Sequence, residues 1–243
     1  LLAVVAVLPG LADGPLQGEA SSRRSQGSPP QFVVAMIRTP VLQVSLAFIL
    51  ASVVLGFTLV ENANYALAEN RAESAAASMD DGRPETAMQS IDRAITLAPD
   101  VGRYHLIRAN ILDQPRGSAA AASDQARLAL GAYQANGRAV NANPFDFYSR
   151  LYFAESTFQL AALGYPGKGE EAINEYRRLT SMLPRFWLPH FLLGRAYVEI
   201  GEPIRAVEAY TEAMTIDPLS VYFYERRAEA YEMQDEYNLA ADD

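Results

Sequence analysis

The stretch WLPHFLLGRAYVEIGEPIRAVEAYTEAMTIDP, residues 187–218, carries the strongest structural signal in the chain. Apolar residues recur at helical spacing on both sides of Gly201, which favours two helices joined by a tight turn at that glycine. Small residues, Gly194 and Ala206, stand where the two helices of such a hairpin would press together, backbone against backbone. Pro218 cannot continue the second helix and therefore ends it. The stretch predicts a helix-turn-helix hairpin.

Similar helix ends occur three more times upstream. Prolines close apolar, helix-periodic segments at Pro99, Pro144, Pro184 and Pro218, which are 45, 40 and 34 residues apart. Self-similarity near 34 residues is typical of a solenoid of helical hairpins, in which each hairpin covers the apolar face of its neighbour. We therefore expect an all-α chain of stacked hairpins.

The segment from Trp187 to Pro218 resembles the tetratricopeptide repeat (TPR). The matching positions are Leu193, Gly194, Tyr197, Gly201, Ala206, Tyr210, Ala213 and Pro218. His190 fills the first large aromatic position of the family and is a departure from its pattern, although Trp187 lies one turn earlier. The resemblance implies a TPR-like α-solenoid of helix-turn-helix repeats.

Four looser copies extend this prediction to residues 61–243, with the fifth repeat truncated. The first contains Ala75, Gly82, Ala87, Ile91, Ala94 and Pro99, and the third contains Ala172, Tyr176 and Pro184 after a lengthened turn at 164–169. The second contains Tyr104, Ile107, Ile111, Ala132, Ala139 and Pro144, with extra residues around 114–123. The fifth contains Tyr224, Ala228, Tyr231 and Ala240.

Residues 41–60 have the length and composition of a membrane span. They carry no charge, and thirteen of the twenty are Val, Leu, Ile or Phe. Twenty helical residues rise about 30 Å, the thickness of one hydrocarbon core. Insertion of the apolar residues contributes about −4 to −8 kcal/mol, which outweighs the cost of the few polar ones. We predict one transmembrane helix over 40–60; a buried core helix is the alternative.

The flanking charges predict the orientation of that span. Arg23, Arg24 and Arg38 precede it, whereas Arg71 is the one basic residue among the fifteen that follow. By the positive-inside rule, residues 9–39 form a polar cytoplasmic loop and the repeats lie on the extracytoplasmic, periplasmic side of the inner membrane. Residues 1–8 are apolar and are interpreted as the end of a preceding membrane helix, so we expect the chain to be a fragment of a longer protein.

Composition argues against several functions. The 243 residues contain no cysteine, two histidines, 20 Lys+Arg and 29 Asp+Glu, a net charge of −9. The acidic balance disfavours nucleic-acid binding, and His105 and His190 lack the further ligands that a metal site needs, so we interpret them as packing or capping residues. The glycines at 164–169 do not fit a phosphate-binding loop. We predict no catalytic, cofactor-binding or metal-binding residue.

The predicted function therefore lies on the surface of the repeats. In TPR proteins the first helices of successive repeats line a concave groove, and the resemblance implies the following groove residues: Leu188, Phe191, Arg195 and Glu199 in the fourth repeat, and Tyr222, Glu225, Glu229 and Met233 in the fifth. They lack the Lys and Asn pattern with which some family members clamp a terminal carboxylate. A basic or neutral protein or peptide partner fits this groove better than an acidic one.

Two functions are consistent with the sequence. The first is a membrane-anchored TPR scaffold, non-catalytic in itself, that mediates protein–protein interaction outside the cytoplasmic membrane. In the second, the order of spans and repeats, with ENANYA at residues 61–66, resembles the C-terminal part of an O-antigen ligase or polymerase-like glycosyltransferase whose catalytic part would lie upstream.

Overall fold

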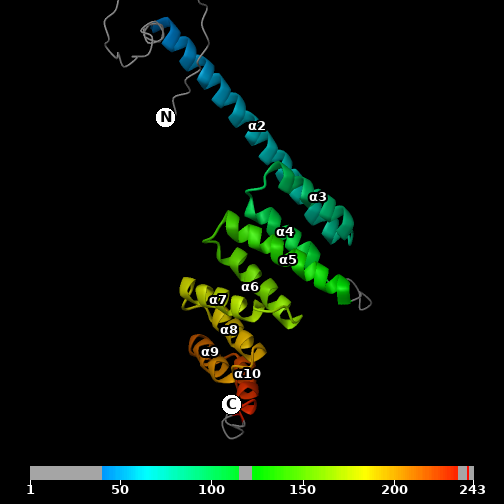
Figure 1. Cartoon of the computed structure of the whole chain (residues 1–243), viewed down its shortest axis with the longest axis vertical. Helices are drawn as coiled ribbons and strands as arrows, with labels where there is room; N and C mark the ends of the chain where they lie inside the picture. The colour runs from blue at the N-terminus through cyan, green and yellow to red at the C-terminus, as the bar shows by residue number, and fades with distance from the viewer. Residues whose placement is uncertain (1–39, 115–121, 235–239, 241–243) are drawn as a thin grey trace, which may run out of the picture. The chain divides into compact units, whose positions relative to one another are not determined.

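The computed structural model describes residues 40–114, 122–234 and 240, and these residues form helices and turns without strands. The helices are α2 (Pro40–Asp80), α3 (Pro84–Leu97), α4 (Gly102–Asp113), α5 (Ala122–Ala142), α6 (Phe147–Ala162), α7 (Lys168–Met182), α8 (Trp187–Glu199), α9 (Pro203–Ile216) and α10 (Val221–Glu232) (Figure 1). The all-α class and the TPR-like solenoid are thereby confirmed. The predicted membrane-helix end at 1–8 and cytoplasmic loop at 9–39 lie outside the described residues.

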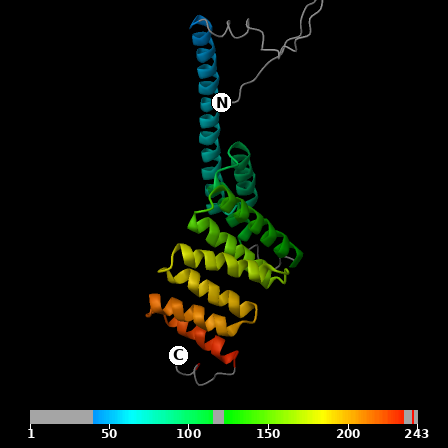
Figure 2. The same ribbon diagram turned by 60° about the vertical axis from the view of Figure 1, so that its left-hand side comes forward.

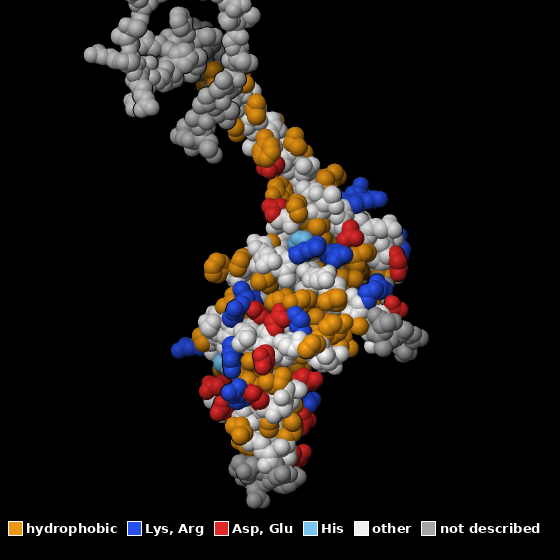
Figure 3. Space-filling model, viewed as in Figure 1, with side chains coloured by type: hydrophobic (Ala, Val, Ile, Leu, Met, Phe, Trp, Pro, Cys, Tyr) orange, Lys and Arg blue, Asp and Glu red, His pale blue; other side chains and the backbone are white. Residues whose placement is uncertain are grey.

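The chain divides into two compact units, residues 1–56 and 57–243. The described part of the first unit is the start of α2. From Val44 to Val60 its large apolar side chains are 54–74% exposed, and Figure 3 shows apolar side chains along this surface. By length and composition α2 could cross a membrane.

Helix α2 does not end at the predicted boundary after Val60. It continues to Asp80, because residues 61–80 contain neither glycine nor proline and are rich in alanine and glutamate. Its last turns serve as the first helix of the first repeat: Ala68, Ala72 and Ala75 are buried in one cluster with residues of α3, which are Ala87, Ile91 and Ala94.

In the second unit, helices that are consecutive in sequence are neighbours in space, as Figures 1 and 2 show for α3 to α10. The hairpins are α4/α5, α6/α7 and α8/α9, and α10 begins the fifth repeat. The extra residues of the second repeat fall between α4 and α5. The repeat prediction therefore matches the order of the described helices.

Glycine forms the turn within a repeat. Gly82, Gly164 and Gly201 each have φ between 69° and 80°, a conformation that a Cβ atom disfavours. Each glycine N–H donates to a carbonyl three residues earlier, and the next N–H donates to a carbonyl five residues earlier (2.8–3.0 Å). This is the Schellman arrangement, which satisfies the last carbonyl groups of a helix.

A proline stands at the turn between repeats. The side chain of the residue six positions later hydrogen-bonds to the carbonyl of this proline. His105, His190 and Tyr224 bond to the carbonyls of Pro99, Pro184 and Pro218 at 2.8, 3.2 and 3.3 Å, and Arg150 donates to the Pro144 carbonyl at 2.9 Å. Both histidines thus hold equivalent structural positions, and neither belongs to a metal cluster within the described ranges.

Gly194 corrects one detail of the predicted packing. Added to Gly194, a Cβ atom would lie 2.5 Å from Cε1 of Tyr210, so that a tyrosine ring, and not the partner backbone, occupies the space beside this glycine. Tyr210 is 1% exposed and Ala206 is fully buried. In the α8/α9 hairpin, the ring of Tyr210 therefore packs against the Cα atom of Gly194.

Candidate partner-binding groove

A groove of about 660 Å³ lies within the second unit. It is lined by the end of α2 and by residues of α4, α5 and α6, among them Met79, Asp80, Leu106, Asn110, Asp113, Gln114, Asn136, Tyr152, Glu155 and Gln159. Three of these four helices are first helices of repeats, which is the surface that the TPR resemblance implies. The groove thus belongs to the first three repeats.

The predicted groove residues occupy the corresponding register two repeats later. Counted from the preceding proline, Phe191, Arg195 and Glu199 stand at the seventh, eleventh and fifteenth positions, and so do Glu225, Glu229 and Met233. The same count from Pro99 gives Leu106, Asn110 and Gln114, which line the groove. From Pro144 it gives Leu151, which is buried in the core, and Glu155 and Gln159, which line the groove. Sequence reasoning missed these residues, although proline counting over the earlier repeats could have found them.

None of the eight predicted residues lines this groove. Phe191 is 5% exposed and belongs to the core, where its ring centroid lies 5.2–5.6 Å from those of Tyr210, Tyr222 and Phe223. Phe191 therefore offers almost no surface to a partner. Leu188 is half-buried and packs against the same core.

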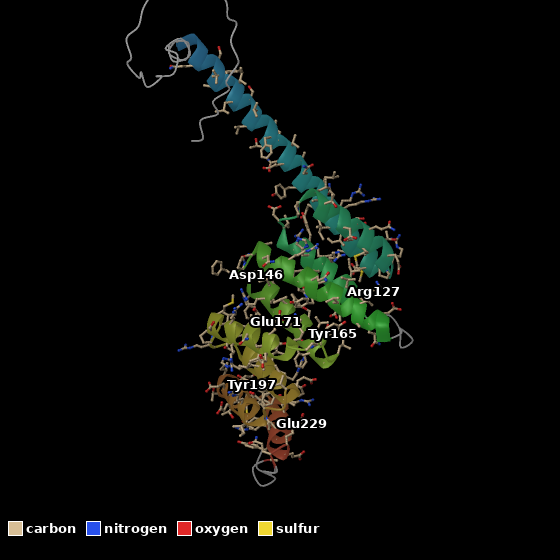
Figure 4. The ribbon with its side chains drawn as sticks, in the orientation of Figure 1. Arg127, Asp146, Tyr165, Glu171, Tyr197 and Glu229 are labelled. Atoms are coloured by element: carbon tan, nitrogen blue, oxygen red, sulfur yellow. The ribbon has the colours of Figure 1, made fainter. Side chains whose placement is uncertain are left out.

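The other predicted residues are accessible, and two of them have ionic partners. Arg195 lies 3.5 Å from Glu155 and over the ring of Phe158. Glu229 accepts from Arg226 at 2.7 Å near the end of α10, where Figure 4 labels it. Glu199, Glu225, Tyr222 and Met233 are exposed. This part of the surface is therefore open, and two of its charged side chains, Arg195 and Glu229, are already paired within the chain.

Helix α6 contributes Tyr152, Glu155, Ser156 and Gln159 to the groove, and a side-chain cap holds the start of this helix. The Asp146 carboxylate accepts from the Ser149 N–H at 2.7 Å and from the Ser149 hydroxyl at 2.6 Å (Figure 4). A side-chain oxygen at this position satisfies a helix N–H that lacks an intrahelical partner. The cap fixes the first turn of the helix that presents Tyr152, Glu155 and Gln159.

Glu155 is held from two neighbouring helices. Its carboxylate accepts a hydrogen bond from the Tyr176 hydroxyl at 2.7 Å, and Arg195 lies 3.5 Å from its other oxygen. Burial, together with the nearby negative charge of Glu155, raises the pKa of Tyr176 well above its usual value. The phenol therefore remains a donor at neutral pH and restrains the Glu155 carboxylate.

Asn136 contributes a buried acceptor. The residue is 5% exposed, and its Nδ2 donates to the Tyr152 carbonyl at 3.0 Å, which assigns the other amide atom as oxygen. That oxygen, Oδ1, is buried and has no hydrogen-bond partner among the described residues. Leaving a buried acceptor unpaired costs free energy, so a hydrogen-bond donor that reached this oxygen would stabilise the structure.

The charge of the groove is negative. Its described lining includes the carboxylates of Asp80, Asp113 and Glu155 and no Lys, Arg or His. The amides of Asn110 and Gln114 bond to each other at 3.1 Å. The lining combines apolar side chains, among them Met79, Leu106 and Ile107, with three carboxylates, several amides and the ring of Tyr152.

The fold is that of a TPR-like α-solenoid, and the groove lies on the first three of its repeats. The profile of the tetratricopeptide repeat family matches residues 189–218, within the α8/α9 hairpin. No curated protein matches the chain in sequence.

Solved structures of TPR proteins share the fold. A crystal structure of MamA is 15% identical, covers 72% of this chain and 87% of its own, and has a TM-score of 0.60. MamA from Desulfovibrio magneticus RS-1 is 14% identical, with coverages of 72% and 89% and a TM-score of 0.59. YrrB, a TPR protein with an unusual peptide-binding site, is 12% identical, with coverages of 71% and 80% and a TM-score of 0.55. The resemblance to O-antigen ligases has no counterpart in these matches.

Proposed function

We propose that this chain is a membrane-anchored TPR scaffold whose concave groove binds a protein or peptide partner outside the cytoplasmic membrane. The observation that carries the binding part is the groove of about 660 Å³ lined by first helices of successive repeats. Among its structural neighbours, YrrB has a peptide-binding site on the same kind of fold.

The anchoring part rests on α2. Burying large apolar side chains such as Val44, Leu50 and Val60, which are 59–67% exposed, in lipid would remove them from water. The extracytoplasmic location rests on the arginines that precede the span. Together these features describe a binding surface tethered near a bilayer.

The binding part is tested by blocking the groove. Ala76 and Gln159 line it, and Ala76 is exposed, so the double variant Ala76→Trp, Gln159→Trp would fill it with two large side chains. The full chain in detergent is used to select binders from a random peptide library. We expect the selected peptides to lose binding to the filled variant.

A matched pair of substitutions provides the control. Ala77 on α2 and Gln89 on α3 are exposed and lie outside the groove lining. The variant Ala77→Trp, Gln89→Trp should bind the selected peptides as the unaltered chain does. Peptides that bind the filled variant equally well would show that this groove is not the binding surface.

A further inference from the structure

We propose that the groove binds an extended peptide segment that carries arginine or lysine side chains, with Glu155 and Asn136 as the anchoring pair. This inference rests on the proposed function and names the chemistry of its partner. Four observations support it: the sign of the charge in the groove, the unpaired buried oxygen of Asn136, the state of the Glu155 carboxylate, and two open tyrosine rings on α6.

The first observation is the excess of acceptors over donors. The carboxylates of Asp80, Asp113 and Glu155 line the groove, and the described lining contains no Lys, Arg or His; Arg195, outside the lining, lies 3.5 Å from Glu155. Asp80 and Asp113 are exposed and form no salt bridge with a described residue. A negative concave surface attracts a cationic segment and repels an acidic one.

The second observation is Asn136, a residue that lines the groove and whose buried Oδ1 atom lacks a described hydrogen-bond partner. Its Nδ2 already donates to the Tyr152 carbonyl, so the amide cannot turn without breaking that bond. A guanidinium or ammonium group is rich in N–H donors and has no acceptor of its own. Its binding would satisfy the oxygen that the fold leaves unpaired.

The third observation is that the carboxylate of Glu155 can accept hydrogen bonds from the same cationic group. The internal cation nearest to its carboxylate is Arg195, at 3.5 Å, and the side chain of Glu155 remains 30% exposed. A contact of that length between partly exposed groups is weak. The carboxylate can therefore accept a closer, bidentate hydrogen bond from an incoming arginine, a geometry that the guanidinium fork favours.

The fourth observation is aromatic. Tyr148 and Tyr152 stand one turn apart on α6 and are 62% and 51% exposed; Tyr152 lines the groove, and Tyr148 lies outside the lining. In several other places the chain covers its own rings with cations, for example Arg177 and Arg205 near Tyr197, Lys168 over Tyr133 and Arg226 over Tyr222. No described cation lies over Tyr148 or Tyr152, which leaves both rings open to a cation–π contact with the partner.

The test compares matched peptides by fluorescence anisotropy with the full chain in detergent. The probes are a labelled Arg-Gly-Ser repeat peptide, the same peptide with every arginine replaced by neutral citrulline, and the same peptide with glutamate in its place. We expect the arginine peptide to bind most tightly and its affinity to fall as NaCl is raised, because salt screens exposed charges. Equal affinity for the citrulline peptide would overturn the inference.

Single substitutions then test which carboxylates of the groove attract the arginine peptide. Glu155→Gln, Asp80→Asn and Asp113→Asn should each weaken the arginine peptide, with Glu155→Gln giving the largest loss, about tenfold. Glu170→Gln is the control, because Glu170 is exposed on α7 and does not line the groove. Should Glu155→Gln fail to fold, the two exposed aspartates still test the charge. An equal loss with Glu170→Gln would show that the attraction is to net charge and not to this groove.

The groove-filled variant separates this inference from the proposed function. If neutral peptides bind the unaltered chain and are blocked by tryptophan at positions 76 and 159, the groove binds partners but the cationic preference is wrong. If filling the groove changes the binding of no peptide, the proposed function fails, and the inference fails with it.

Discussion

Gly194 shows how strongly one position can constrain a repeat. The ring of Tyr210 occupies the place that a Cβ atom of residue 194 would take, with three ring atoms 2.5–3.0 Å from it. The ring is buried and packs against Phe191, with centroids 5.6 Å apart, so that it cannot move aside freely. The contact makes the α8/α9 hairpin intolerant of any side chain at residue 194.

We therefore predict that Gly194→Ala lowers the free energy of unfolding by about 1–3 kcal/mol, the usual cost of overpacking, even though alanine favours helices over glycine. Thermal or urea unfolding measures it. In a Tyr210→Leu background the same substitution should cost less, since the ring is gone. Equal costs in both backgrounds would show that the ring is not the obstacle.

The residue six positions after each inter-repeat proline makes the same contact in four repeats, although its side chain differs from one repeat to the next. Two histidines, an arginine and a tyrosine bond to the proline carbonyl at four successive turns. The geometry needs only a polar atom that reaches that carbonyl from the first helix of the next repeat. The identity of the residue is thus free, whereas its location is not.

Among the helices, the packing of α4 on α2 includes an ionic contact at its edge. Arg103 and the Tyr104 hydroxyl both donate to the carboxylate of Glu69, with the tyrosine at 3.1 Å. The hydrogen bond from Arg103 holds the pKa of Glu69 below its ordinary value of 4.5. Burial of the Tyr104 phenol, followed by the bond to Glu69, raises the pKa of Tyr104.

The lowered pKa makes the stability of this contact depend on pH. A carboxyl group with a lower pKa in the folded chain stabilises it above the unfolded value, near 4.5, and loses that contribution as pH falls through the folded value. We predict that Glu69→Gln lowers the melting temperature at neutral pH and that the difference disappears below the folded value.

Thermal unfolding across a pH series measures this prediction. Glu212→Gln serves as the control, because Glu212 is exposed on α9 and has no ion pair with a described residue. Its melting temperature should follow that of the unaltered chain at each pH. A difference between Glu69→Gln and the unaltered chain that persisted at low pH would mean that the ionic contact is not its source.

For the complete chain, the decisive question is the side of the membrane on which the repeats lie. The three arginines before the apolar span, against one arginine in the fifteen residues after it, favour an extracytoplasmic repeat domain. We predict that protease added outside intact spheroplasts digests the repeats, as detected by an antibody against residues 187–218. Protection until the membrane is lysed would reverse the orientation.

The order of helices and turns could be predicted from the sequence, because it depends on local backbone chemistry. Gly201 predicts a turn because glycine adopts positive φ at low cost, and Pro218 predicts a helix end because proline lacks an N–H. These effects act within a few residues, so their spacing indicated stacked hairpins without knowledge of any contact. The register of the groove was also contained in that spacing, since it repeats with the prolines.

Side-chain environments, in contrast, depended on how separate helices pack. Phe191 was expected in the groove, but rings from α9 and α10 bury it; Gly194 faces a ring from α9 and not a backbone. The sequence does not distinguish Asn136, because its buried, unpaired oxygen results from the packing of α5 on α6, where its Nδ2 donates to the Tyr152 carbonyl. Burial and hydrogen bonding across helices are long-range properties, and the pattern within one helix does not reveal which neighbour will cover each of its faces.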